Sequence, residues 1–400
     1  MQMRSITRFF VFGPGIIAST FCIAQSPTDL VQQALKSRDA IKAAELQLSA
    51  AKHTASSLGA LPGTRLEAGA GTRPDVTGGE DLSLFQPIDV FGKSRVFRAG
   101  GVAGVKLAEA TLRQRKIDVQ TEVISALATW SNAKRNLATA NDQLEITKQL
   151  EHATKIRVEA RALPELQMTR ASLEVQKVEQ LVIDREAAVQ TALVKLKQSL
   201  GAASAELPSV ATLEIPIGVS TPERDRPELL LLNSQRAGFE ADQRQAKLSL
   251  LPDFEIQARR SPWSEAERYG VRFQIAMPLW DHGASKQKAR AAERQATAAS
   301  LEYSDTAKRI RAEIEAAQIQ LDAVKKSLAA YTRLAEGAKG LMEKTQRGFE
   351  LGANTLIDVL DAKRTLSDSL EQLSGAQMSV DQASAELLRA QGQILGEDKR

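Results

Sequence analysis

Two aspartates near the end of the chain are the residues whose type and spacing could do chemistry. Asp358 and Asp361 lie three positions apart, so on a helix they share one face. Carboxylates held close together repel one another and attract cations. The alternative is structural, because acidic residues in the first turn of a helix stabilise its positive end. The position of this pair in the whole chain decides between the two interpretations.

Histidine and cysteine offer no second candidate. His53, His152 and His282 are scattered, and we expect each on a helix surface or in a loop. His282 follows Asp281 and could touch a metal, but a metal site needs further ligands. No nucleophile is placed beside a base, so an enzyme is the least supported class, and we expect no cofactor, metal site or catalytic residue.

Residues 1–24 have the pattern of a secretory signal. Arg4 and Arg8 precede a largely apolar stretch that ends in small residues. A single-span anchor is the alternative, but the apolar run is short for one. Cys22, the only cysteine, follows Phe21 rather than a small residue, so we expect it to be removed with the leader and not lipidated. The exported chain would then lack disulfides and cysteine-bound metals.

Charge and hydropathy narrow the possible partners. A formal net charge of +4 is too balanced to indicate nucleic-acid binding. Beyond the leader, no stretch is apolar enough for a transmembrane helix, so any span of a membrane is expected to be β.

The elements that must position the aspartates alternate between helices and short strands. In the first half we expect a helix at 26–58, strands at 65–70 and 81–86 around a loop at 71–79, a long helix at 94–160, a break at 161–164, and a helix to 200. After a proline-dotted linker, the second half repeats this order: a helix at 227–250, strands at 253–259 and 271–277, a long helix at 285–349, a turn, and a final helix.

Landmarks in the two halves correspond at an offset of about 190 residues, which predicts an internal duplication. Pro62 corresponds to Pro252, and Ala162 to Ala353. We therefore expect a signal at 1–24, a first helix–hairpin–helix repeat at 25–205, a linker at 206–226 and a second repeat at 227–396. Together these would form a single structural unit within the trimer considered below.

The second long helix has the apolar spacing of a coiled coil, with alternating steps of four and three. The seam consists of Tyr303, Ala307, Ile310, Ile314, Ala317, Leu321, Val324, Leu328, Tyr331, Ala335, Ala338 and Met342. In each half, the two shorter helices placed end to end would match one long helix in length. Both helical turns would then lie at one end of the molecule and both strand pairs at the other.

The strands alternate between apolar and polar residues, which is the pattern of a barrel with lipid outside and a polar lumen. Most aromatic residues beyond the leader lie in the strand-pair segments, with Trp263 and Trp280 placed for two interfacial girdles. A β layer packed on helices is the alternative. Four strands cannot close a barrel around a pore, so several subunits would have to contribute.

At this point the chain resembles the outer-membrane efflux channel family, the TolC-like outer membrane factors. The most specific match is residues 351–362, LGANTLIDVLDA, which is similar to the family's periplasmic tip. Residues 278–283 and 226–229 also resemble family signatures. Residues 86–95, QPIDVFGKSR, are similar to the heavy-metal, CzcC-like branch.

The resemblance implies a mainly α fold with a small β part. Long coiled-coil helices would form an α-barrel, and a homotrimer would close a twelve-stranded transmembrane β-barrel with four strands from each subunit. The partners implied are a periplasmic adaptor (membrane fusion) protein and an inner-membrane efflux pump. The implied location is the outer membrane, with the helices extending into the periplasm.

The resemblance also assigns site residues. Asp358 and Asp361 match the aspartates that ring the channel entrance, and Phe349 matches the family's gating tyrosine but lacks its hydroxyl. The adaptor-docking tip would comprise Gly352, Asn354, Thr355, Arg161, Leu163 and Pro164. Asn354 replaces a family arginine, Arg161 a glycine and Gln167 an aspartate. These departures leave open how the entrance closes, with helix packing and the aspartate ring as the simplest gate.

The function expected is passive conduction from the periplasm to the exterior within a tripartite efflux system, with metal cations as one candidate cargo. The alternative is a soluble periplasmic coiled-coil adaptor or structural protein. The sequence names neither the exported substrate nor the pump and adaptor.

Overall fold

The computed structural model describes residues 26–60, 63–73, 76–201, 225–260 and 269–396. The predicted signal with Cys22, almost all of the linker at 206–226, and Trp263 lie outside the described residues. The first half contains α1 (Pro27–Ser37), α2 (Asp39–Leu58), β1 (Arg65–Arg73), β2 (Val76–Ile88), α3 (Lys93–Glu159) and α4 (Glu165–Leu200). The second half contains α5 (Pro227–Leu248), β3 (Asp253–Arg260), β4 (Tyr269–Ala276), α6 (Ala284–Glu350) and α7 (Leu356–Gln391).

The long helices of the two halves have equal lengths, and so do the helices that follow them. The long helices α3 and α6 both hold 67 residues, and α4 and α7 both hold 36. These lengths support the predicted duplication, which itself stays a prediction. The expected long helices and the breaks after them are confirmed.

The predicted helix at 26–58 is wrong as a single element, because it is divided at Arg38. Arg38 has extended backbone between α1 and α2, and Ser26 caps α1 through a capping box with Asp29. The Arg38 side chain turns toward the end of α4, where Nη1 donates to the carbonyls of Gln198 (3.2 Å) and Ser199 (3.0 Å). This contact with a distant segment is the reason for the division.

The predicted strand at 81–86 and the loop before it are also corrected. β2 begins at Val76, and pairing with β1 continues through Gly71 opposite Gly79. β2 also continues through Pro87 to Ile88. The last β1 partner is Arg65 opposite Phe85, so Pro87 lies where β2 has only β3 beside it. A strand edge tolerates a residue without an N–H group.

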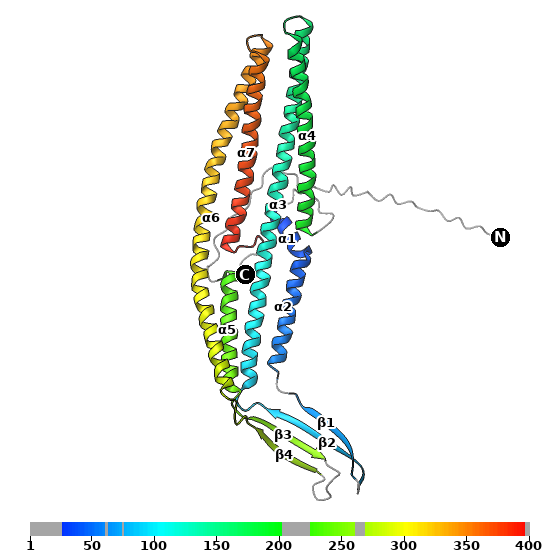
Figure 1. Ribbon diagram of the computed structural model, residues 1–400, viewed down its shortest axis with the longest axis vertical. Coiled ribbons are helices and arrows are strands. Elements are labelled where there is room, and N and C mark those ends of the chain that lie inside the picture. Colours follow the sequence, from blue (N-terminus) through cyan, green and yellow to red (C-terminus); the bar gives the residue numbers. More distant parts are fainter. Residues whose placement is uncertain (1–25, 61–62, 74–75, 202–224, 261–268, 397–400) are drawn as a thin grey trace, which may run out of the picture.

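The helices lie side by side in one layer and run along the long axis of the molecule (Figure 1). Near the sheet the neighbours across the layer are α2, α3, α5 and α6; in the other half they are α4, α3, α7 and α6. The short helices therefore lie end to end beside the long ones, as the matching lengths predict. The helical turns and the sheet lie at opposite ends (Figure 1).

An arginine joins each pair of stacked short helices. Arg226 precedes α5 and is only 2% exposed; its Nη1 donates to the carbonyls of Arg389 (2.9 Å) and Ala390 at the end of α7. Its Nη2 lies 2.8 Å from Glu228. Arg38 occupies the same place between α2 and α4. Each arginine supplies donors to helix-terminal carbonyls that have no partner within their helix.

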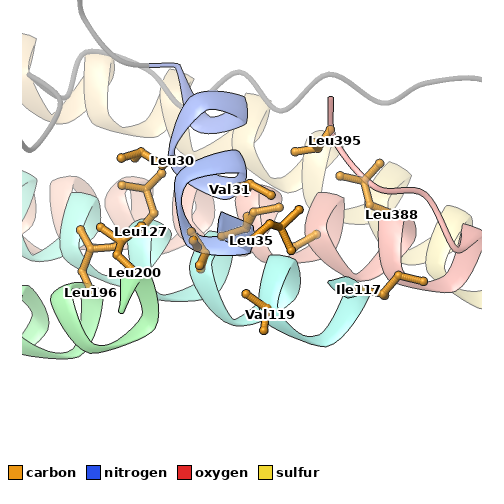
Figure 2. Close-up of a cluster of buried hydrophobic side chains, with 14 of the residues drawn as sticks. Leu30, Val31, Leu35, Ile117, Val119, Leu127, Leu196, Leu200, Leu388 and Leu395 are labelled. Carbon is orange, nitrogen blue, oxygen red and sulfur yellow. The ribbon is translucent and has the colours of Figure 1, made fainter. Parts of the chain in front are cut away.

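The main core lies at mid-height, where α1 crosses the layer. Figure 2 shows apolar side chains from α1, α3, α4 and α7 converging there together with Leu395. Gln120 on α3 is fully buried and holds the segment that follows α7: Nε2 donates to the Gln393 carbonyl (2.9 Å), and Oε1 accepts from the N–H of Leu395 (2.7 Å). On α6, every position of the predicted coiled-coil seam is buried or half-buried, which confirms the seam.

The four strands form one antiparallel sheet in the order β1-β2-β3-β4. The register places Leu66, Leu84, Ala258 and Val271 in one row across it, and Phe254 beside Ile275 on the same face. Arg65, Gln257 and Arg272 belong to the opposite face. Among the described elements, no helix covers either face, so the expected two-sided sheet is present and the alternative β layer on helices is not (Figure 1).

Candidate functional site

The turn between α6 and α7 is built around Gly352. Its φ of +83° is a left-handed conformation that favours glycine. The N–H of Gly352 donates to Phe349 (2.9 Å), and the N–H of Ala353 donates to Gly348 (2.7 Å), which is the pair of bonds that closes a Schellman motif. Asn354 Nδ2 adds a bond to the Thr345 carbonyl (3.0 Å). The turn is therefore a fixed shape that presents a small exposed surface.

Thr355 and Asp358 start α7 with a capping box. The Asp358 carboxylate accepts from the Thr355 N–H (2.8 Å) and hydroxyl (2.7 Å), while Thr355 Oγ1 accepts from the N–H of Asp358 (3.3 Å). The side-chain bond from Thr355, followed by its backbone bond, lowers the pKa of Asp358, against a small opposing effect of burial. Asp358 is thus ionised and exposed, and it has the structural role that the alternative interpretation assigned to it.

Asp361 lies one helical turn further along α7 and is also exposed. An oxygen of its carboxylate lies 3.6 Å from Nη1 of Arg364, an exposed pair whose contribution to stability is small. The structure therefore places both aspartates beside the turn as exposed carboxylates, with Asp358 held in position by the cap.

Phe349 is buried, unlike the two exposed aspartates. It is 1% exposed and packs in a cluster with Met342, Leu356 and Val359, against which Leu163 of the other turn is packed. The guanidinium of Arg157 on α3 lies over its ring. Phe349 is therefore a packing residue that holds the two helical turns together, which the sequence did not indicate.

The turn between α3 and α4 has the same construction without glycine. Arg161 has a φ of +57°, and the N–H groups of Arg161 and Ala162 donate to Val158 (2.9 Å) and Arg157 (2.8 Å). A side chain in this conformation is strained. Pro164 then precedes α4 as its N-cap residue without a side-chain cap.

A buried ion pair joins the helices just below the turns. Lys363 on α7 is 4% exposed, and its Nζ lies 3.3 Å from Glu174 on α4. Burial lowers the pKa of Lys363, and the charge and hydrogen bond of Glu174 oppose this. The contact of Arg157 with Phe349 and the ion pair of Lys363 with Glu174 both link the α3–α4 hairpin to the α6–α7 hairpin.

The exposed apolar residues at the tips were missed as site residues. Leu351 is 86% exposed, and Ile357 and Leu166 are also exposed. Each lies at a helix end near the turns, outside any buried seam. The signal available in the sequence was an apolar residue beside the turn, as in Leu351 before Gly352.

The rest of the described chain contains no competing constellation. Among the described residues, no group of three His, Cys, Asp or Glu side chains is arranged to hold a metal. His53, His152 and His282 are exposed and lie on α2, on α3 and in the loop before α6. None of the described helices combines the length and apolar character needed to cross a bilayer.

Comparison with known proteins identifies relatives along most of the chain. The model of the family "Outer membrane efflux protein" matches residues 30–202 and 223–393. The chain is 26% identical to the cobalt-zinc-cadmium resistance protein CzcC of Cupriavidus metallidurans, over 76% of this chain and 75% of that protein. It is 27% identical to the outer membrane protein TolC of Vibrio cholerae, but the match spans only 35% of this chain and 32% of that protein.

Solved structures share the fold at low identity. The open state of the Neisseria gonorrhoeae MtrE outer membrane channel superimposes with a TM-score of 0.80 at 16% identity, covering 94% of this chain and 90% of that one. CusC superimposes with a TM-score of 0.78 at 15% identity, covering 92% of each chain. The predicted mainly α fold with a small β part is confirmed.

Proposed function

Since this chain belongs to the outer membrane efflux protein family and is an outer-membrane protein extending into the periplasm, we propose that it is the passive duct of a tripartite efflux system. The duct would be a homotrimer that receives substrate from a periplasmic adaptor and an inner-membrane pump. It would perform no chemistry and would supply only a path to the exterior.

The apolar face of the sheet is the observation that carries this proposal. On this face Phe273 is 75% exposed, and Leu66, Val271 and Ile275 are also exposed. A single chain in water would leave this surface uncovered at a cost of roughly 25 cal/mol per Å² of apolar area. In a transmembrane barrel, lipid covers the apolar face of the sheet and water contacts the polar face, so each face meets a suitable solvent.

The edge helices support closure by further copies of the chain. On α6, Leu301, Ile319, Leu334 and Leu341 are exposed and fall on one side of the helix at 3.6 residues per turn. At the opposite edge of the layer, α4 exposes Leu166, Leu173, Ile183 and Val194. Apolar surfaces at both edges of one layer favour edge-to-edge contact between subunits, which also joins β1 to β4 of the next subunit. The three copies follow from the family resemblance.

We place the channel entrance at the helical turns. Three copies would bring six exposed carboxylates, from Asp358 and Asp361, around one opening. Phe349 and Arg157 would hold the hairpins that form it. The tip, from Leu351 to Thr355 with Arg161, Leu163 and Pro164, is exposed except at the half-buried Asn354 and Leu163, and it would receive the adaptor.

Metal cations are the substrate class that the comparison with CzcC and the acidic entrance favour together. Loss of the gene should lower tolerance to zinc or cobalt, and the Asp358→Asn/Asp361→Asn variant should restore tolerance less well than the wild type. Equal tolerance with and without the gene would argue against metal export while leaving the duct intact.

Single-cysteine labelling tests the membrane position of the sheet. Cys22 is the only cysteine and lies in the predicted leader, so a cysteine introduced at Phe273 can be labelled alone. In vesicles, a fluorophore at Phe273→Cys should be quenched by a lipid-soluble quencher. At the neighbouring Gln274→Cys, on the polar face, it should be quenched by a water-soluble one. Equal aqueous quenching at both sites, with protein in the soluble fraction, would favour a soluble periplasmic protein.

A further inference from the structure

We infer that the apolar face of the sheet carries a binding site for an acyl lipid with a phosphate headgroup. This inference rests on the proposed function, because it requires the sheet to lie in a bilayer. The site crosses all four strands, and its charged end lies where β3 ends and β4 begins, at the end of these two strands remote from the helices.

A groove of about 520 Å³ marks the site on β1 to β4. Its apolar lining comes from Leu66, Leu82, Leu84, Ala258 and Val271. Because partners in the sheet register share a face, Leu66, Leu84, Ala258 and Val271 form a continuous row across four strands. The groove therefore lies across the strands on the surface that meets lipid, and it fits hydrocarbon.

Two arginines, Arg259 and Arg260, also line this groove, but Arg259 is opposite Ser83 on the polar face, so only Arg260 is a cation on the apolar face. In the register it is opposite Leu82 on one side and Tyr269 on the other, so it belongs to the apolar face. It is exposed, and among the residues that the structure describes it has no ion-pair partner. A cation on a lipid-facing surface costs least near the membrane boundary, where its charge can reach a headgroup.

The position of Arg260 selects a phosphate. The helices lie in the periplasm, so the opposite end of the sheet meets the outer boundary of the membrane (Figure 1). A guanidinium offers a planar fork of donors that matches phosphate oxygens. Tyr269, 72% exposed and directly beside Arg260, adds a hydroxyl at the same level. Acyl chains would cover the apolar lining of the groove, and a phosphate would pair with the Arg260 guanidinium.

A second copy of the chain is a poorer occupant. If the apolar sheet face of a second chain packed on the groove, its own Arg260 would either approach the first Arg260 or leave that charge buried against apolar side chains. Both arrangements are unfavourable. A phosphate lipid neutralises the charge and covers the groove.

Lipid retention tests the inference. The purified mature trimer would be analysed by native mass spectrometry after exposure to phosphatidic acid, to phosphatidylcholine with the same chains, or to inorganic phosphate. We expect phosphatidic acid to be retained in preference. Arg260→Gln should reduce this preference on the order of tenfold, which is the loss of one charge-assisted contact.

The matched control is Arg272→Gln, an exposed arginine on the polar face of β4. It should leave the preference unchanged. The inference is overturned if the wild type retains both lipids equally, if Arg272→Gln has the same effect as Arg260→Gln, or if inorganic phosphate displaces the lipid. Channel conductance of the same samples separates the two claims: conductance without lipid preference contradicts only the site, whereas no conductance contradicts the proposed duct.

Discussion

The guanidinium carbon of Arg157 lies 4.7 Å from the centre of the Phe349 ring, and Arg157 Nη1 donates a 2.9 Å hydrogen bond to the Phe349 carbonyl. One side chain of α3 thus holds both the ring and the backbone at the end of α6. The two residues lie far apart in the sequence, and their contact joins the two hairpins at the turns.

Replacing Arg157 by Ala should loosen the junction of the hairpins. The cation–π contact and the hydrogen bond together contribute roughly 1–3 kcal/mol. Faster hydrogen exchange in residues 345–360 would report the loss. Arg170→Ala, at an exposed position on α4, is the control and should leave exchange unchanged. Identical protection in the Arg157 variant and the wild type would show that the contact does not hold the hairpins together.

Replacing Arg161 by Gly should stabilise the protein. The left-handed conformation of Arg161 costs an ordinary residue about 1 kcal/mol, whereas glycine adopts it freely. Denaturant unfolding should show a gain of about that size. Gly352→Ala, at the corresponding position of the other turn, should show a loss. A destabilised Arg161→Gly variant would mean that contacts of the arginine outweigh its backbone strain.

Arg226→Ala should release the end of α7 from the start of α5. The substitution removes bonds to two helix-terminal carbonyls and leaves Glu228 without its buried partner, which costs about 3 kcal/mol. Arg38→Ala should cost less, because the Arg38 side chain is 20% exposed. Global unfolding measurements compare the stability losses of the two variants. A loss in Arg38→Ala that equals or exceeds the loss in Arg226→Ala would contradict the importance of burial.

Asp381 should make stability depend on pH. Burial raises the pKa of this carboxyl to about 6, opposed by the charge of Arg135. Because the folded state then holds its proton more tightly than the unfolded state, stability should fall as pH rises from about 4 to about 6. Asp381→Asn should lack this fall and gain on the order of 2–3 kcal/mol over wild type across that interval. Parallel pH profiles for the two proteins would contradict the raised pKa.

The sequence predicts the elements well where periodicity is long or sharply broken. The apolar spacing of the seam on α6 has the period of a helix, and the alternation in β3 and β4 has the period of a strand. Each pattern therefore predicts its element directly. The glycine-rich end of the β1–β2 pair, where Gly71 is opposite Gly79, has no such alternation, and the loop predicted there was wrong.

Contacts between distant segments could not be predicted in the same way. Nothing near Arg38 indicates that the end of α4 will lie beside it and divide the helix. Likewise, the position of Phe349 in a helical pattern does not show that Arg157 will cover it. The aspartates were found by spacing, but the capping role of Asp358 depends on Thr355 adopting an extended conformation first.

The central claim is a duct with an acidic entrance, and conductance in a planar bilayer tests it most directly. Purified mature protein would be compared with the Asp358→Asn/Asp361→Asn variant, with trimers verified in both and Asp368→Asn, an exposed aspartate further along α7, as control. The account predicts cation-selective channels in the wild type and the control, and reduced selectivity in the double variant. Unchanged selectivity in the double variant would contradict the acidic entrance, and the absence of channels from the wild type would contradict the duct itself.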